Sequence, residues 1–370
     1  MRIDRIEITA VDVPYHDGVR PLVTSGLVLT GAQHLLVRVC TDDGHVGLGE
    51  AVPRPSVYGE NREGIAAAIR DYLGPKVIGG DPFAVLSVWQ SWSRVIGNNT
   101  AKAALDIALH DLIGRATGVP LYRLLGGGER HDVPLTRALG MGEPELVTDE
   151  AAEAVETGFS GIKIKVGKDV RTDIAVVDAV RSRIGDDVFL YVDANCGYSR
   201  LDANRAATGF AAAGVALFEE PLPPADVGGR RALTQRSGVA ILADESLNDF
   251  PRFLEEVLSG SIAAASLRAV RAGFVGARDL VGVTRAIPVE LLVGSHRELG
   301  VGLAANVQLA AAYNVSLPAE LSSGDTLEHT LLREPLDGRR GVMSVPGGPG
   351  LGVELDDDAI RRYSVWSFDV

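Results

Sequence analysis

The strongest constraint on the fold of this chain is a repeat of short apolar runs in its C-terminal two-thirds. The runs recur about every 25–30 residues and alternate with stretches whose apolar residues have helical spacing. The apolar runs are residues 133–139, 161–166, 188–192, 215–218, 239–242, 262–267, 288–293 and 316–321. The helical stretches are residues 144–156, 170–183, 200–213, 249–258, 274–286 and 301–313. Eight strands that alternate with helices predict an α/β fold, a parallel TIM (β/α) barrel.

An open doubly wound parallel sheet is the alternative for such a pattern. No Gly-x-Gly-x-x-Gly turn follows an early strand, so we prefer the barrel.

The first third of the chain has a different pattern. Three predicted strands cover residues 2–12, 34–40 and 45–50, the last two joined at an Asp-Asp-Gly turn. Three predicted helices cover residues 65–73, 83–95 and 100–117. The tail of the chain is rich in Gly and Pro and then aromatic, and we expect it to pack back on the first domain. The predicted parts are an α+β domain at 1–128, the barrel at 129–345 and a returning segment at 346–370.

Composition narrows the classes of partner. The net charge of −13 argues against nucleic acid or an anionic membrane surface, although local positive charge could still bind an anionic substrate. No apolar run approaches the roughly 20 residues that a membrane-spanning helix needs. Cys40 and Cys196 are too few for a disulfide framework and suit a reducing compartment, and the N-terminus resembles a strand rather than a signal peptide. We therefore expect a cytoplasmic protein.

Charged residues stand at the C-terminal ends of the predicted barrel strands, where the active sites of such barrels lie. From Lys165 the steps to the next four are 28, 26, 25 and 24 residues, one βα unit each, and these residues are Asp193, Glu219, Asp244 and Arg268. Three carboxylates from successive strands offer the hard oxygen ligands that Mg²⁺, or Mn²⁺, prefers. We predict Asp193, Glu219 and Asp244 as metal ligands. The alternative is that acidic residues at these positions cap the following helices.

A lysine pair precedes these carboxylates. Lys163 and Lys165 are two apart on one strand and share a face, while Ile162, Ile164 and Val166 occupy the opposite, helix-covered face. The lysines should therefore point into the barrel rather than to solvent. Repulsion favours a neutral amine in one of them, which is a competent general base, while the other can hold a substrate carboxylate. With a divalent cation as Lewis acid, this set predicts removal of a proton alpha to a carboxylate, through a stabilised enolate.

Several motifs follow one another along nearly the whole chain in a fixed order. They are the segments 47–51, 101–112, 124–127, 163–165, 192–195, 218–221, 243–246 and 346–352. Their order and spacing resemble the muconate-lactonizing branch of the mandelate racemase/muconate lactonizing enzyme family, which belongs to the enolase superfamily. The resemblance implies a modified TIM barrel, an α+β capping domain whose loops close over the barrel mouth, and a homo-oligomer that acts on a small-molecule carboxylate.

The resemblance also implies roles for individual residues. Lys165 would be the base and Lys163 a carboxylate contact, next to the three metal ligands. Asn195 and Glu245 would support the ligands from behind. Further candidate substrate contacts are His296, Glu298, which matches the family's glutamate at the end of strand seven, and Tyr58. Tyr58 lies in one of two capping segments, near residues 15–29 and 53–60, that we expect to help set specificity.

Two departures from the family pattern limit the reaction. Arg268 stands at the end of strand six where the family has a lysine, and arginine is a poor general acid or base because it stays protonated. Arg271 would occupy the place in the alternative register. Arg268 suits a one-base reaction as a fixed cation, with Glu245 as its expected partner. The second departure is at residues 319–323, which lack the Asp-x-Asp pair usual in dipeptide epimerases.

Three functions remain open at this stage. The first is a one-base cycloisomerase or lyase, of the muconate-lactonising kind. The second is a racemase or epimerase of an amino-acid derivative or dipeptide, which needs proton exchange on both faces of the substrate and therefore a substitute for Arg268. The third is a non-catalytic, metal-binding barrel. His296 is either a site-lining or a structural residue, because the mandelate-racemase branch pairs its strand-seven histidine with an aspartate that Arg268 replaces.

Overall fold

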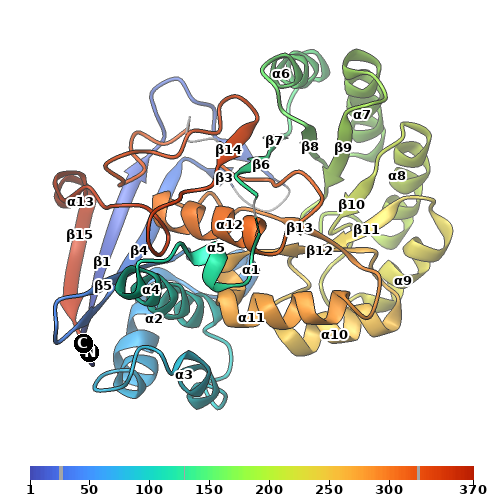
Figure 1. Ribbon diagram of the computed structural model, residues 1–370. Helices are drawn as coiled ribbons and strands as arrows, with labels where there is room; N and C mark the ends of the chain where they lie inside the picture. Colours follow the sequence, from blue (N-terminus) through green and yellow to red (C-terminus); the bar gives the residue numbers. More distant parts are fainter. Residues whose placement is uncertain (25–27, 129, 323–325) are drawn as a thin grey trace.

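The computed structural model describes residues 1–24, 28–128, 130–322 and 326–370. A mainly antiparallel α+β domain lies against a parallel barrel, with the chain termini close together at the outer edge of the first domain (Figure 1). No helix within the described ranges is long and apolar enough to cross a membrane. The two domain boundaries predicted from the sequence, one of which falls at residue 129 outside the described residues, stay a proposal.

The first domain is built on a four-stranded antiparallel sheet in the order β15-β1-β4-β5. Its strands are β1 (Ile3–Pro14), β4 (Gly31–Thr41), β5 (Val46–Ala51) and β15 (Ser364–Asp369). The three strands predicted near the N-terminus are confirmed. The tail is confirmed to return to this domain, because β15 pairs with β1. A short hairpin, β2 (Leu22–Val23) with β3 (Val28–Leu29), extends toward the barrel mouth.

This domain also contains several helices, two of which pack directly on the sheet. They are α1 (Pro55–Tyr58), α2 (Arg62–Ala68) with its continuation η1 (Ile69–Leu73) and η2 (Gly74–Lys76), α3 (Val85–Ser91), α4 (Asn99–Thr117) and α5 (Leu121–Leu124). The helix predicted at 83–95 is shorter than expected. Helix α4 packs directly on β5, where a Cβ at Gly47 or Gly49 would lie 2.0 Å from a carbonyl oxygen of α4. The two glycines are therefore required by this close approach.

The barrel contains a seven-stranded parallel sheet in the order β13-β12-β11-β10-β9-β8-β7. Its strands are β7 (Thr136–Leu139), β8 (Gly161–Lys165), β9 (Phe189–Asp193), β10 (Leu217–Glu219), β11 (Ala240–Ala243), β12 (Ala264–Leu267) and β13 (Glu290–Val293). The outer helices are α6 (Pro144–Glu156), α7 (Val170–Ile184), α8 (Arg200–Ala212), α9 (Val227–Arg236), α10 (Phe250–Ser259), α11 (Ala269–Thr284) and α12 (Gly300–Ala312). Figure 1 shows them around the sheet. The predicted barrel is confirmed.

The eighth predicted strand, 316–321, is wrong as a strand. Only an isolated parallel bridge joins Ala319 to Leu135. The segment nevertheless connects both edge strands, since Thr136 N donates to Ala319 O at 2.8 Å and Glu320 N donates to Val293 O at 2.9 Å. Pro318 has no N–H to donate, which shortens the ladder. The barrel is closed by this short segment.

Three other elements differ from the sequence prediction. The run 133–139 divides into β6 (Asp132–Pro134), which pairs with β14 (Val342–Ser344), and β7. Helix α9 was not predicted, because two glycines near its start and few apolar residues weaken its pattern. Helix α11 begins earlier than predicted and is kinked at Gly273, where φ is 63°. A last helix, α13 (Asp357–Tyr363), precedes β15.

Candidate active site

The predicted charged residues converge at the C-terminal ends of the barrel strands. The register pairs Lys165 on β8 with Asp193 on β9, and Asp193 with Glu219 on β10. Asp244 follows β11 and Arg268 follows β12, so they continue the same rim. All five are buried. The convergence expected from the spacing of one βα unit is thus present in the structure.

Both lysines point into the barrel, as the strand period predicts. Lys163 Nζ lies 2.9 Å from Asp193 Oδ2 and 2.9 Å from Glu219 Oε2. Lys165 Nζ lies 2.5 Å from Asp193 Oδ2 and donates to Asn195 Oδ1 at 3.0 Å. Burial lowers the pKa of Lys163, but the carboxylates around it outweigh burial and hold that pKa well above its usual value. Lys163 is therefore held in its charged ammonium form.

The three predicted metal ligands differ in how well they are paired. Both carboxylate oxygens of Glu219 are buried without a hydrogen-bond partner among the described residues. Burial, and then the charges of Asp193 and Asp244, raise the pKa of Glu219 to about 8. The Lys163 ammonium, 2.9 Å from Glu219 Oε2, offsets part of the cost of burying this carboxylate, and the cluster of three carboxylates can still take a further cation. The donor set fits a hard divalent cation, with oxygen ligands from three neighbouring strands.

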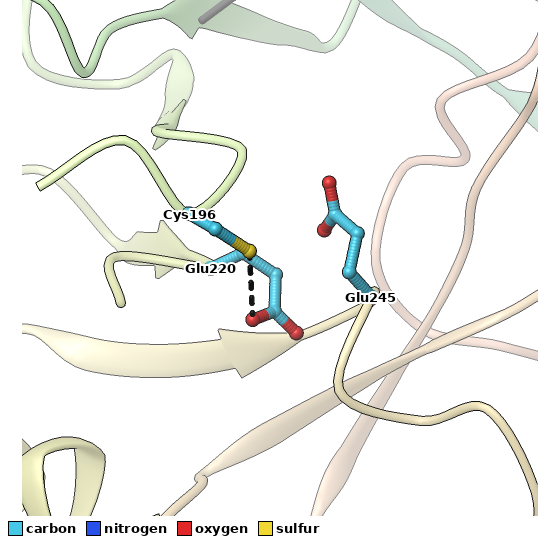
Figure 2. Close-up of side chains that lie close together, drawn as sticks. All are labelled: Cys196, Glu220 and Glu245. Atoms are coloured by element: carbon cyan, nitrogen blue, oxygen red, sulfur yellow. Dashed lines mark hydrogen bonds between the residues drawn. The ribbon is translucent and has the colours of Figure 1, made fainter. Parts of the chain in front are cut away.

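The predicted ligands are not the residues whose ligand atoms lie closest together. Among the described residues, Cys196, Glu220 and Glu245 each bring one such atom within 4.8 Å of the other two. Figure 2 shows these three side chains, with Cys196 Sγ 3.9 Å from Glu220 Oε2. The other oxygen of Glu220 accepts from the backbone N–H groups of Asp244 and Ser246 at 2.6 and 2.8 Å. Glu220 therefore fixes the turn that carries Asp244.

Arg268 has a different partner from the one expected. Its Nη2 lies 2.5 Å from Asp244 Oδ2 and its Nη1 donates to Ser295 O, whereas Glu245 Oε1 accepts from Asn195 Nδ2 at 2.8 Å. The prediction that Glu245 pairs with Arg268 is wrong. Arg271 also reaches Asp244, with Nη1 2.7 Å from Oδ1. Asp244 contacts both guanidinium groups, so Asp244 rather than Glu245 is the partner of Arg268.

The electrostatics of this pair keep Arg268 charged. Burial lowers the pKa of Arg268, but Asp244 and other nearby groups raise it well above its ordinary value. Burial raises the pKa of the Asp244 carboxyl, but the charges of Arg268 and Arg271 outweigh burial and lower this pKa below its ordinary value. Arg268 is thus a fixed cation at the end of strand six.

The loop after β13 holds the strand-seven candidates. Glu298 Oε1 accepts from His296 N at 2.7 Å and Oε2 from Ser295 Oγ at 2.6 Å, so this buried carboxylate shapes the loop. Tyr58 Oη lies 3.0 Å from Nδ1 and 3.1 Å from Nε2 of His296. Burial, and then Arg268 and Arg54, lower the pKa of His296 well below its usual value. His296 is therefore a neutral imidazole at the barrel mouth.

A cavity of about 210 Å³ lies over these residues. Eight of the predicted site residues line it, namely Lys163, Lys165, Asp193, Asn195, Asp244, Glu245, Arg268 and His296. Tyr58, Glu219 and Glu298 are not part of this lining. Both predicted capping segments contribute, through Leu22 and Leu29 in the first and Arg54 in the second. Residues 25–27 of the first segment lie outside the described residues.

Two family models match the chain, one over each of its two main parts. The model of the mandelate racemase/muconate lactonizing enzyme N-terminal domain matches residues 5–126, and that of the enolase C-terminal domain-like family matches residues 146–359. The chain belongs to the mandelate racemase/muconate lactonizing enzyme family. It is therefore an enzyme of the enolase superfamily, of the muconate cycloisomerase-like kind.

Individual members of this family cover the whole chain. The chloromuconate cycloisomerase CbnB of Cupriavidus necator is 34% identical over 98% of this chain and 99% of its own. The structure of a muconate lactonizing enzyme from Mycobacterium smegmatis, complexed with muconolactone, is 34% identical and covers 99% and 100% of the two chains with a TM-score of 0.94. A dipeptide epimerase from Enterococcus faecalis V583, complexed with Mg and L-Leu-L-Tyr, is 29% identical, covers 96% and 100%, and has a TM-score of 0.88.

Three residues at or near the site of the present protein were not assigned from its sequence. Glu320 lies 3.4 Å from Lys163 and accepts from Ser295 N at 3.3 Å. Arg54 comes from the capping domain and donates to the carbonyl oxygen of His296. Glu320 lies in the segment that closes the barrel and Arg54 lies in the capping domain, so the periodicity of the barrel strands does not reveal either residue. Glu50 stands in one of the family motifs, but only the fold shows what it binds.

Glu50 joins the capping domain to the barrel. It is fully buried, and its two oxygens accept from Leu299 N and Gly302 N at 2.7 Å each. His34 Nδ1 lies 2.8 Å from the same carboxylate. Helix α12 has no capping side chain of its own, so Glu50 serves as the anion at its N-terminus. The loop that carries His296 and Glu298 is thereby anchored to the first domain.

Proposed function

We propose that this enzyme removes the proton alpha to a substrate carboxylate and uses one base, as a cycloisomerase or lyase of the muconate-lactonising kind. The observation that carries the proposal is the arrangement across the barrel mouth. Lys165 approaches the rim from β8, while the strand-six position holds a permanently charged arginine. Only one of these two groups can exchange a proton near neutral pH.

The residues of the site have different tasks in this proposed reaction. Lys165 takes the alpha proton on Nζ, and Lys163 holds a substrate carboxylate through its charged ammonium. Arg268 contributes positive charge near the carboxylate as negative charge develops on it. The capping segments exclude water from the cavity over these groups.

Asp193, Glu219 and Asp244 would hold Mg²⁺ or Mn²⁺. When bound, a divalent cation supplies Lewis-acid stabilisation of the charge that develops on the carboxylate. The buried carboxylate of Glu219, which has an ion pair with Lys163 but no hydrogen bond among the described residues, supports this assignment, as does a family member whose structure is described as a complex with Mg.

A racemase or epimerase is the second candidate, and one observation favours it. His296 lines the cavity as a neutral imidazole, so it could exchange a proton where Arg268 cannot. In this case His296→Asn would abolish inversion of the substrate while Lys165-dependent exchange from the other face persists.

Proton NMR in heavy water with enzyme and magnesium tests the proposal. The compounds are cis,cis-muconate, acyl amino acids, dipeptides and hydroxy acids. We expect lactonisation, elimination, or deuterium uptake without inversion, and we expect Lys165→Ala to abolish it. Lys168→Ala is the matched control, because Lys168 is exposed just after the end of β8 and its loss should leave the rate unchanged.

Other outcomes contradict the proposal. Deuterium uptake with inversion would show a second proton-transfer group and support the epimerase. Failure of every compound to react, together with failure to bind magnesium, would favour the non-catalytic barrel.

A further inference from the structure

A thiol and two carboxylates beside the predicted magnesium ligands have no task in the proposed reaction. Cys196 lies in the loop after β9, Glu220 directly follows β10, and Glu245 lies two residues after β11. Each brings one ligand atom within 4.8 Å of the other two. Figure 2 shows the end of the Glu245 side chain directed toward the other two residues. None of the three predicted magnesium ligands belongs to this group.

Each carboxylate of the group has one oxygen fixed by the protein. Glu220 Oε1 accepts from Asp244 N at 2.6 Å. Glu245 Oε1 accepts from Asn195 Nδ2 at 2.8 Å. The second oxygen of Glu220, Oε2, is the one that lies 3.9 Å from Cys196 Sγ. Hydrogen bonds that hold one side of a ligand in this way orient its other side toward a metal ion.

The second oxygen of Glu245 is an independent indication of a ligand from outside the chain. The side chain is buried, with 7% of the residue exposed, and its Oε2 has no hydrogen-bond partner among the described residues. Neither Glu245 nor Glu220 forms an ion pair in the described part of the chain, whereas each of the three predicted magnesium ligands does. A buried carboxylate oxygen with neither kind of partner is costly, and a bound cation would remove this cost.

The thiol is held beside these carboxylates and is accessible from the active site. Cys196 N donates to Glu220 O at 2.8 Å, which fastens the loop after β9 to the end of β10. Cys196 and Glu245 both line the cavity of about 210 Å³. A cation can therefore reach the group from the barrel mouth.

The ligand types select the cation. One sulfur and two carboxylate oxygens suit Zn²⁺, which takes three protein ligands and a water molecule in a tetrahedral site, whereas Mg²⁺ takes oxygen ligands. At ordinary zinc bond lengths the ligand atoms of a tetrahedral site lie about 3.3–3.5 Å apart. The three side chains therefore need to approach one another by only about 1 Å.

We propose that Cys196, Glu220 and Glu245 form a second cation site, which binds Zn²⁺ and is distinct from the all-oxygen site proposed for magnesium. Burial, and then the charges of Glu245 and Glu220, raise the pKa of the free Cys196 thiol above its usual range. When the cation binds, the S–H bond breaks, a sulfur–zinc bond forms and the proton is released to solvent. The inference does not rest on the proposed function, because it requires neither a substrate nor a reaction.

Cobalt titration of the full-length enzyme in excess magnesium tests the inference. A bond between Co²⁺ and a thiolate gives an intense charge-transfer band in the near ultraviolet, and oxygen ligands do not give this band. Any Co²⁺ that enters the all-oxygen site is therefore silent in this measurement. We expect the wild-type enzyme to develop the band, and we expect Zn²⁺ to remove it by displacing Co²⁺, since zinc binds such ligands more tightly.

Variants locate the site. Cys196→Ser should abolish the band. Cys40→Ser is the matched control and should keep the band, because Cys40 is the other cysteine of the chain and lies on β4 in the first domain. Glu245→Gln should weaken cobalt binding by at least about tenfold, since loss of even an outer partner of a metal ligand costs about 10–100-fold. Circular dichroism spectra check that the variants fold.

Four results would overturn the inference. They are no thiolate band in the wild-type enzyme, a band that persists in Cys196→Ser, a band that is lost in Cys40→Ser, and an unchanged cobalt Kd in Glu245→Gln. The deuterium-exchange experiment separates this site from the proposed function. Exchange without the band would refute the second site and leave the reaction in place, whereas the band without exchange would do the reverse.

Discussion

The contact between Glu50 and helix α12 gives a prediction whose size follows from the structure. The carboxylate is fully buried and accepts from Leu299 N, Gly302 N and the His34 side chain. In Glu50→Gln one oxygen remains an acceptor, but the other is replaced by an NH₂ group that faces a backbone N–H. Two donors then oppose each other at the N-terminus of a helix, where negative charge is favoured.

The energetic cost has two parts. Loss of one charge-assisted hydrogen bond costs about 1.5–3 kcal/mol, and a buried N–H left without a partner costs about 1–3 kcal/mol. We therefore expect the free energy of unfolding to fall by about 3–5 kcal/mol in Glu50→Gln. Glu63→Gln is the matched control, because the Glu63 side chain is 67% exposed and should change stability by no more than about 0.5 kcal/mol.

Urea unfolding measures this difference with two probes. Trp89, Trp92 and Trp366 all lie in the capping domain or the returning tail, so their fluorescence reports on that part of the molecule. Far-UV circular dichroism reports mainly on the barrel helices. A loss below about 1 kcal/mol in the fluorescence transition would refute the view that Glu50 fastens the capping domain to the barrel.

Three further predictions concern the site and the thiols. Arg268→Lys keeps the charge but cannot bond both Asp244 and the Ser295 carbonyl, so deuterium exchange on an active compound should slow by about tenfold or more, and an unchanged rate would argue against a role at the site. Magnesium at a hundredfold excess over its Kd should stabilise the enzyme by about 2.7 kcal/mol in thermal unfolding, EDTA should reverse this, and Glu219→Gln should lose the effect. Burial raises the pKa of Cys40 to about 11 and that of Cys196 above its usual range, so both residues are neutral thiols at pH 8. At this pH a thiol reagent should react with the folded enzyme at least about tenfold more slowly than with the urea-unfolded chain. Equal rates would contradict the burial of the two thiols.

Much of the barrel and its charged rim could be predicted from the chain itself. A βα unit returns each new strand to the same edge, so residues one unit apart, such as Asp193 and Glu219, must be neighbours at that edge. The two-residue period of a strand likewise places Lys163 and Lys165 on one face. Elements with weak periodicity were harder to predict from the sequence, as the glycine-containing helix α9 and the proline-shortened segment at Ala319 show.

The partners chosen within the site were decided by tertiary structure alone. Local spacing brings Asp244 and Glu245 to the same rim as Arg268, but side-chain direction and burial determine that Asp244 takes the guanidinium. Contacts across the two domains are further removed from local pattern, since Arg54 reaches the His296 carbonyl across 242 residues of sequence. Periodicity determines which edge a residue reaches because it depends only on near neighbours. Which charge meets which depends on distances of a few ångströms, and these are set only when the capping domain closes on the barrel.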